Sequence, residues 1–188
     1  MTARSHLVKK ARKDYPEVGI KKGESYYWWK FNFSRMIYRS KTPPKRSQLI
    51  HSPFLAQVAD IEDQIQSATY DDWESIKDSV VSDLESLRDE QEEKRSNMPE
   101  QLQECDSGNT LQERYDGLDE MINELGAVDI EEIDEEDVRQ EVESELKKEE
   151  NETEEDFKAR VDEEIRDRVE TKKEESLEEF HDVSYQGP

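Results

Sequence analysis

The sequence is short of the residues that cross-link, bend or bury a chain. Its 188 residues include one cysteine, Cys105, with six glycines and six prolines, and apolar residues make up only 31%. A single cysteine excludes an intramolecular disulfide, and with it the cross-linked frameworks of small secreted domains. An average globular domain is roughly 45–50% apolar, so this chain has too little apolar material for one large core. We therefore expect thin helical hairpins, an assembly or partial disorder.

Signals for membrane insertion and secretion are also missing. No apolar run approaches the ~18 residues of a membrane-spanning helix. The basic N-terminus lacks the apolar segment of a secretory signal. These absences predict a cytoplasmic protein without a membrane partner.

Motifs that carry catalysis are missing too. Neither the phosphate-binding GxxxxGKS/T loop nor the dinucleotide-binding GxGxxG pattern occurs. A zinc site needs about four Cys or His ligands at short spacing, and the available residues are widely scattered: His6, His51, Cys105 and His181. The one Glu-x-x-His step, Glu178 to His181, falls short of a di-iron bundle, which uses two such steps and two further glutamates. The acidic run at 129–137 lacks the central glycine of an EF-hand. The sequence thus predicts no enzyme, no cofactor and no metal site.

Charged residues are abundant, at 41% of the chain, and they are segregated by sign. Residues 1–48, here called the head, contain 13 basic and three acidic residues and carry +10. Residues 49–188, the body, contain 14 basic and 47 acidic residues and carry −33. A basic head on an acidic body predicts that either end binds a partner of opposite charge.

Glycine, proline and aromatic residues divide the head. Residues 1–24 are basic and interrupted by glycine and proline, which predicts a flexible arm. Residues 25–41 begin with the aromatic run SYYWWKFNF, which favours a strand, and Ser34-Arg35 can turn the chain into a second strand. Residues 42–51 contain Pro43-Pro44, which favours an extended basic linker and a domain boundary.

The predicted aromatic hairpin has two unlike faces. Period-two alternation places one set of side chains on one face, Tyr27, Trp29, Phe31 and Phe33, and another on the opposite face: Tyr26, Trp28, Lys30 and Asn32. An isolated two-stranded hairpin is marginal in water. We therefore expect its apolar face to dock on the helices, on another chain or on a ligand.

Residues 52–126 predict an antiparallel helical hairpin or coiled coil. Ser52-Pro53 combines a capping hydroxyl with proline at the first helical position, and the helix restarts or kinks at Thr69-x-x-Asp72. A capping box at Thr110-x-x-Glu113 starts the second helix, and Gly126 is expected just after its end. Two thin helices rarely bury their apolar stripes fully, so we expect a homo-oligomer, with a dimer favoured. The expected contact residues lie on these stripes: Trp73, Ile76, Val80, Leu84, Leu118 and Ile122.

Residues 127–188 contain 26 acidic and nine basic residues and predict an acidic helical tail that is partly disordered. Thr153-x-x-Asp156 starts a helix whose apolar residues recur every four positions: Phe157, Val161, Ile165 and Val169. Pairs such as Glu164 with Arg168 stabilise a solvated helix by ~0.2–0.5 kcal/mol each. The predicted fold class is therefore mainly α, with an N-terminal basic aromatic β-hairpin, a helical hairpin and acidic amphipathic helices.

The head has the composition of a nucleic-acid-binding surface. Phosphates attract lysine and arginine side chains that lack a nearby acid, and exposed aromatic rings stack on bases at ~1–3 kcal/mol per base. The candidate residues are Lys21, Lys22, Tyr26, Trp28, Lys30, Arg35, Arg39, Lys41, Lys45 and Arg46. The same basic residues equally suit an acidic protein surface, and the aromatic residues equally suit a small core inside the head.

The acidic body supports a second hypothesis from another class. Residues 49–188 would bind a basic protein partner, either as an acidic inhibitor that mimics DNA, of the anti-defence type, or as an assembly or scaffold factor. Nine basic residues interrupt the tail and the head itself attracts nucleic acid, which counts against a dedicated mimic. A further reading has the tail fold back on the head and screen it. The two classes differ in which half of the chain is necessary for binding.

Three stretches, KKGESYYWWKF, SKTPPKRSQL and LQERYDGLDEMINEL, resemble uncharacterised small acidic helical proteins of tailed phages and prophages, over about residues 1–130. The resemblance implies a phage-encoded protein in the host cytoplasm or inside the virion, and it implies no particular activity or binding residue. Residues 23–46 are also similar to the arm-binding modules of phage integrases, in the order aromatic strand, turn and basic strand, although no catalytic domain follows.

Overall fold

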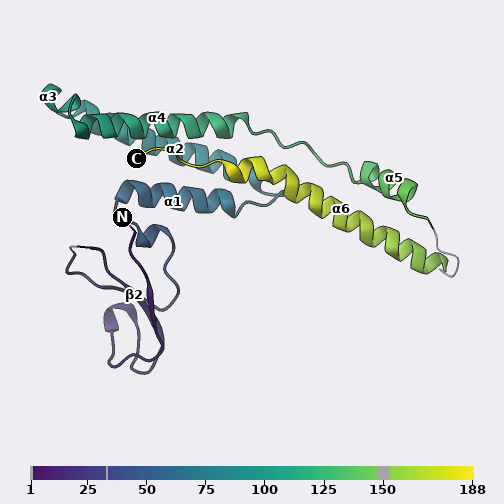
Figure 1. The fold of residues 1–188 in the computed structure, drawn as a ribbon, viewed down its shortest axis with the longest axis horizontal. Coiled ribbons are helices and arrows are strands. Elements are labelled where there is room, and N and C mark those ends of the chain that lie inside the picture. Colours follow the sequence, from purple (N-terminus) through teal and green to yellow (C-terminus); the bar gives the residue numbers. More distant parts are fainter. Residues whose placement is uncertain (1, 33, 148–152) are drawn as a thin grey trace.

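The computed structural model describes residues 2–32, 34–147 and 153–188. Figure 1 shows a small β-sheet beside one end of a long helical body, from which two further helices project at the other end. The predicted fold class, mainly α with an N-terminal β element, is confirmed.

The head forms a three-stranded antiparallel sheet in the order β1-β2-β3. Its strands are β1 (His6–Val8), β2 (Tyr26–Trp29) and β3 (Tyr38–Ser40). The arm predicted over residues 1–24 is not a flexible extension, because it supplies β1 and the 3-10 helix η1 (Pro16–Val18). Gly19 and Gly23 have φ angles of 67° and 93°, the left-handed conformations that the turns of this segment require.

Alternation of side chains along β2 gives the sheet two faces. The register places one set on the first face, His6, Val8, Tyr26, Trp28 and Arg39, and another on the second face: Leu7, Tyr27, Trp29, Tyr38 and Ser40. The prediction separated the same residues within β2, but it extended the strand to residue 33. The strand ends at Trp29, and Phe31 lies beyond it with its ring edge-on to Tyr38 and His51 at 5.5 and 5.2 Å. Phe33 lies outside the described residues.

The predicted proline-containing linker is bound to both the head and the body. It contains η2 and leads into the first helix, α1, with bounds Ser47–Leu49 and Pro53–Gln66. A backbone bridge joins Thr2 to Ile50, and Arg46 Nη1 lies 2.7 Å from Oε2 of Glu62 on α1. The extended boundary expected at residues 42–51 is therefore a docked segment.

The helical body continues with α2 (Trp73–Ser96), α3 (Glu100–Gln103) and α4 (Asp106–Ala127). Ser52 Oγ accepts a hydrogen bond from the backbone N–H of Leu55, so the predicted N-cap of α1 is confirmed. The predicted first helix is two helices, because the chain turns at residues 67–72 and α2 packs against both α1 and α4.

The ends of α4 differ from the prediction. The helix begins at Asp106, so Thr110 lies inside it and donates its hydroxyl to the carbonyl of Asp106 at 2.8 Å instead of capping. Gly126 also lies inside the helix, which continues to Ala127. Serine, threonine and glycine are common at helix ends, but they do not force a helix to begin or end there. The ends of a helix can therefore lie a few residues away from them.

The main core lies between α1, α2, α4 and the C-terminal end of α6 (Glu154–Asp182). Its fully buried side chains are Ile65, Val80, Leu84, Leu118, Met121, Leu125 and Phe180. Three predicted dimer contacts are therefore internal, and the other three are partly buried against the same core: Trp73, Ile76 and Ile122. Val80, Leu84 and Leu118 are therefore closed to a second chain, because α1 and the end of α6 cover them within one chain, and self-association itself stays a prediction.

The acidic tail forms α5 (Glu135–Glu145) and the long helix α6. α5 packs against the first half of α6 through a small apolar cluster, here called the α5–α6 cluster: Val138, Val142, Val161, Ile165 and Val169. Thr153 Oγ1 accepts a hydrogen bond from the N–H of Asp156 at 3.1 Å, which confirms the predicted start of α6. Residues 148–152, part of the tail expected to be partly disordered, lie outside the described residues.

Arg168 connects the two helices of the tail. It binds Glu164 on its own helix at 2.8 Å, as predicted, and also Glu145 of α5 at 2.6 Å. The hydrogen bond from Arg168 lowers the pKa of Glu145. The narrow apolar stripe of α6 therefore packs against α5 of the same chain.

The segment after α6 returns to the core. Tyr185 packs edge-on against Phe54, with 5.5 Å between ring centroids, and lies so close to Gly117 that a Cβ atom there would be 2.9 Å from its ring. Burial raises the pKa of Tyr185 to about 12. Its backbone N–H donates to Oε1 of Glu62 at 3.1 Å. Because Glu62 also binds Arg46, one carboxylate joins the head, α1 and the C-terminal segment.

Candidate nucleic-acid interface

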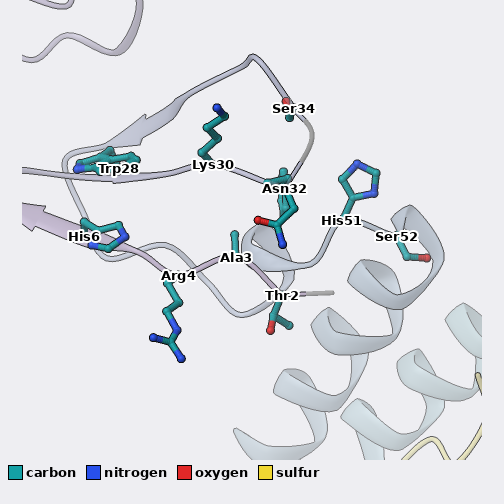
Figure 2. A pocket seen from close by; sticks show the side chains of 11 residues that line it. Thr2, Ala3, Arg4, His6, Trp28, Lys30, Asn32, Ser34, His51 and Ser52 are labelled. Atoms are coloured by element: carbon teal, nitrogen blue, oxygen red, sulfur yellow. The ribbon is translucent and has the colours of Figure 1, made fainter.

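An open pocket of about 920 Å³ lies where the head meets the start of α1. Figure 2 shows that its lining comes from three segments: the N-terminal residues, β2 with its extension, and the residues before α1. The basic and aromatic side chains of the lining are Arg4, His6, Trp28, Lys30, Phe31 and His51. Among the described residues that line this pocket there is no aspartate or glutamate. The pocket therefore combines aromatic surface with positive charge.

A stacked pair of rings forms one wall of the pocket. Pairing of β1 with β2 places His6 opposite Trp28, and their rings stack with centroids 4.7 Å apart and planes 24° from parallel. Trp28 is half-buried, whereas His6 is exposed, so the imidazole forms the outer layer. Phe31 and His51 supply a second aromatic pair in an edge-on arrangement. A nucleobase, which has two flat faces, can extend such a stack.

Two cations lie next to the stacked rings, both on the side toward α1 (Figure 2). Arg4 precedes β1 and Lys30 follows β2, and both side chains are exposed. Neither has an acidic partner within the described part of the chain, so both charges are available to an anion. Arginine and lysine in such positions bind phosphate oxygens.

Several predicted binding residues have other roles. Arg39 lies 3.8 Å from Glu17 and stacks over the Tyr15 ring at 4.3 Å, while Lys41 lies 3.4 Å from Glu24. With Arg46 bound to Glu62, three of the ten candidates are neutralised within the chain. Four more, Lys21, Lys22, Arg35 and Lys45, are exposed and lie outside the pocket.

Tyr26 is the clearest correction among the candidate residues. It is only 8% exposed and packs in a buried cluster with Ala11 and Ile20, so it offers no ring face to a base. The hydrogen bond to Tyr15, together with burial, raises the pKa of Tyr26. The same hydrogen bond lowers the pKa of Tyr15. Of the predicted residues, Trp28 and Lys30 alone lie in the pocket described by the structure.

Four charged or aromatic lining residues are not among the predicted ones: Arg4, His6, Phe31 and His51. His6 and His51 are 45 positions apart, and only the pairing of β1 with β2 and of Thr2 with Ile50 brings them to one pocket. Three-residue β1 shows no periodicity that could reveal this pairing. The one local sequence feature that indicates this pocket is the pair Trp28 and Lys30, which lie two positions apart in an aromatic segment.

A second depression, here called the acidic groove, lies in the body and has a volume of about 510 Å³. It runs between residues 129–134, α5 and α6, and eight carboxylate side chains line it: Asp129, Glu131, Glu132, Asp134, Asp137, Glu141, Glu175 and Glu179. Ile130 and Ile133 contribute apolar surface. Lys172 is the single cation of this lining, and its amine already binds Glu141 at 2.9 Å.

Comparison of the chain with protein-family models, with curated proteins and with solved structures gives no match in any of the three. None of the described helices is both long enough and apolar enough to cross a membrane. Across residues 2–32, 34–147 and 153–188, no group of three or more His, Cys, Asp or Glu side chains could hold a metal ion. Function must therefore be argued from the geometry of the two charged surfaces.

Proposed function

We propose that the head binds single-stranded nucleic acid through its open pocket. The observation that carries the proposal is the stack of His6 on Trp28 with Arg4 and Lys30 in the same pocket, and no acid among the described lining residues. A base extends the stack on the exposed face of His6, and the adjacent phosphates pair with the two cations. Bases of a duplex are already stacked on each other, so a single strand fits this arrangement better.

The acidic body confines nucleic acid to the head. Its charge of −33 repels phosphates from the helices, whereas the head carries +10. Charge attraction therefore acts at long range, and stacking of bases on the aromatic rings acts once the strand is in contact with the head. Because mobile ions screen charges beyond about 10 Å at 0.1 M salt, we expect affinity to fall steeply as salt is added.

Fluorescence anisotropy of labelled oligonucleotides with the full-length chain tests the proposal. We expect single strands to bind more tightly than a duplex of the same sequence. Arg4→Ala with Lys30→Ala should weaken single-strand binding by about tenfold or more. Lys21→Ala with Lys22→Ala is the matched control, because it removes the same charge from exposed positions outside the pocket. An equal loss of affinity in both double variants would mean general charge attraction without a site.

The aromatic contribution has its own variant. His6→Ala removes the outer ring of the stack from an exposed position, so it should weaken binding without unfolding the sheet. Base stacking is worth ~1–3 kcal/mol, and we therefore expect a fivefold loss of affinity or more on that basis. Circular dichroism should show unchanged helix content. Unaltered affinity would remove base stacking from the mechanism.

The alternative hypothesis makes the opposite forecast for the same titrations. A chain that acts through residues 49–188, as an inhibitor or an assembly factor, would bind none of the oligonucleotides even at low salt. It would instead bind a lysine-rich peptide, and charge reversal in the acidic groove would abolish that binding. Such a result would replace the nucleic-acid proposal.

A further inference from the structure

The head exposes large apolar side chains that do not line its pocket. Of the five large apolar side chains that the described residues expose, four belong to the head: Leu7, Met36, Ile37 and Tyr38. Met36 is 64% exposed and Leu7 is 54% exposed. Leu7 and Tyr38 lie on the second sheet face, opposite the face of His6 and Trp28, and the other two directly precede Tyr38. Met36, Ile37 and Tyr38 are consecutive where β3 begins and are here called the apolar edge, whereas Leu7 lies on β1, the strand at the other side of the sheet.

The surroundings of the apolar edge favour an acidic occupant. Arg35 directly precedes Met36 in the connection between β2 and β3, and the described residues of that connection include no acid. A matching surface must therefore combine carboxylates with some apolar area. The acidic groove has this composition, because eight carboxylates surround Ile130 and Ile133 and its one lysine is already paired.

The head cannot reach the groove of its own chain in this conformation. The head is fixed at the N-terminal end of α1 by Arg46 and by the bridge of Thr2 to Ile50. α6 meets the other end of α1, where Gln66 donates to the carbonyl of His181, and the groove lies further along α5 and α6. α1 has 14 residues and so spans about 21 Å. Figure 1 shows the sheet and α5 at opposite ends of the molecule.

We propose that the apolar edge of one chain docks into the acidic groove of a second copy. Met36 and Ile37 contact the isoleucine surface of the groove, while Arg35 pairs with its carboxylates. Each chain offers one edge and one groove, so the contact is heterologous and repeats head to tail, giving open chains or a closed ring. His6 and Trp28 of the pocket lie on the opposite sheet face and take no part in this contact, so oligonucleotide binding and self-association can be measured separately.

Sedimentation velocity of the full-length chain tests the contact. We expect the average mass to rise above the monomer with concentration at low salt and to fall when salt is raised. Met36→Glu with Ile37→Glu blocks the edge, and Glu175→Lys with Glu179→Lys blocks the groove. Each double variant should weaken association by more than about tenfold, because like charges then face each other. A wild-type chain that stays monomeric at every concentration would overturn the proposal.

Mixing the two blocked variants gives the decisive result. Each has one intact surface, so the mixture should form dimers and nothing larger, whereas each variant alone stays monomeric. A mixture that remains monomeric would exclude a head-to-tail contact. Leu102→Glu and Glu120→Lys with Glu124→Lys are matched controls at exposed positions outside both surfaces, and they should associate like the wild type. The edge variant should still prefer single strands to a duplex, although its two added carboxylates lower the overall affinity, which separates this proposal from the function of the pocket.

Discussion

Phe180→Ala is expected to destabilise the main core by about 3–5 kcal/mol, the usual cost of truncating a fully buried phenylalanine. Phe180 has no exposed surface, and its ring meets Trp73 edge-on at 6.2 Å between centroids. It comes from α6 but packs among side chains of α1, α2 and α4. The variant therefore removes the contact that closes the core. Urea unfolding followed by circular dichroism should show a clearly lower midpoint.

Phe157→Ala is the control on the same helix. Phe157 is only partly buried and packs at the α5–α6 cluster, away from the main core. Its removal should leave the main unfolding transition within about 1 kcal/mol of the wild type, as is usual for side chains outside the core. If the two variants shifted the transition equally, the main core and the α5–α6 cluster would unfold as one unit. The separate role of Phe180 in the main core would then be refuted.

Local signals predicted the helices better than the way they pack. Ser52 and Thr153 marked the starts of α1 and α6 because a capping hydroxyl acts on backbone groups three residues away. The apolar spacing also found Val80, Leu84 and Leu118 as one set. The residue that covers these three side chains could not be predicted from the sequence. Phe180 lies 96 positions beyond Leu84 and falls outside the regular apolar stripe that ends at Val169. A contact at such separation leaves no periodic trace in the chain.

For the candidate pocket too, local sequence predicted some of the residues, and contacts between distant segments decided the rest. Trp28 and Lys30 were found because a binding strand must carry aromatic and basic residues in alternation. Tyr26 has the same composition around it, yet η1 and its flanking turns cover its ring. The sequence indicates no ring contact for His6 or His51, because nothing in their own neighbours predicts that either ring packs against another. Composition thus locates the candidate pocket, whereas strand register decides which residues line it.

The ion pairs of the head explain why its net charge overstates its binding surface. Arg39, Lys41 and Arg46 each bind a glutamate within the chain. The backbone N–H of Lys21, together with the charge of Lys41, lowers the pKa of Glu24, so this carboxylate stays ionised and paired at neutral pH. These three cations are therefore partly neutralised within the chain, whereas Arg4 and Lys30 have no acidic partner among the described residues.

Val142→Asp is expected to detach α5 from α6 while the main core stays folded. Val142 has no exposed surface, and the α5–α6 cluster has only five buried side chains. A carboxylate placed there would be buried without a partner, which costs several kcal/mol and exceeds what so small a cluster can supply. Amide hydrogen exchange should show loss of protection along α5 and the first half of α6. Protection of α2 and α4 should not change.

Ser144→Asp is the matched variant for this prediction, because it adds the same charge at an exposed position of α5. It should retain wild-type protection in both helices of the tail. Loss of protection in α2 and α4 of Val142→Asp would mean that the tail and the main core unfold together. Protection of α5 in that variant would mean that α5 does not depend on its apolar contact. The acidic groove has one wall on α5, so the variant that detaches α5 should also lose head-to-tail association.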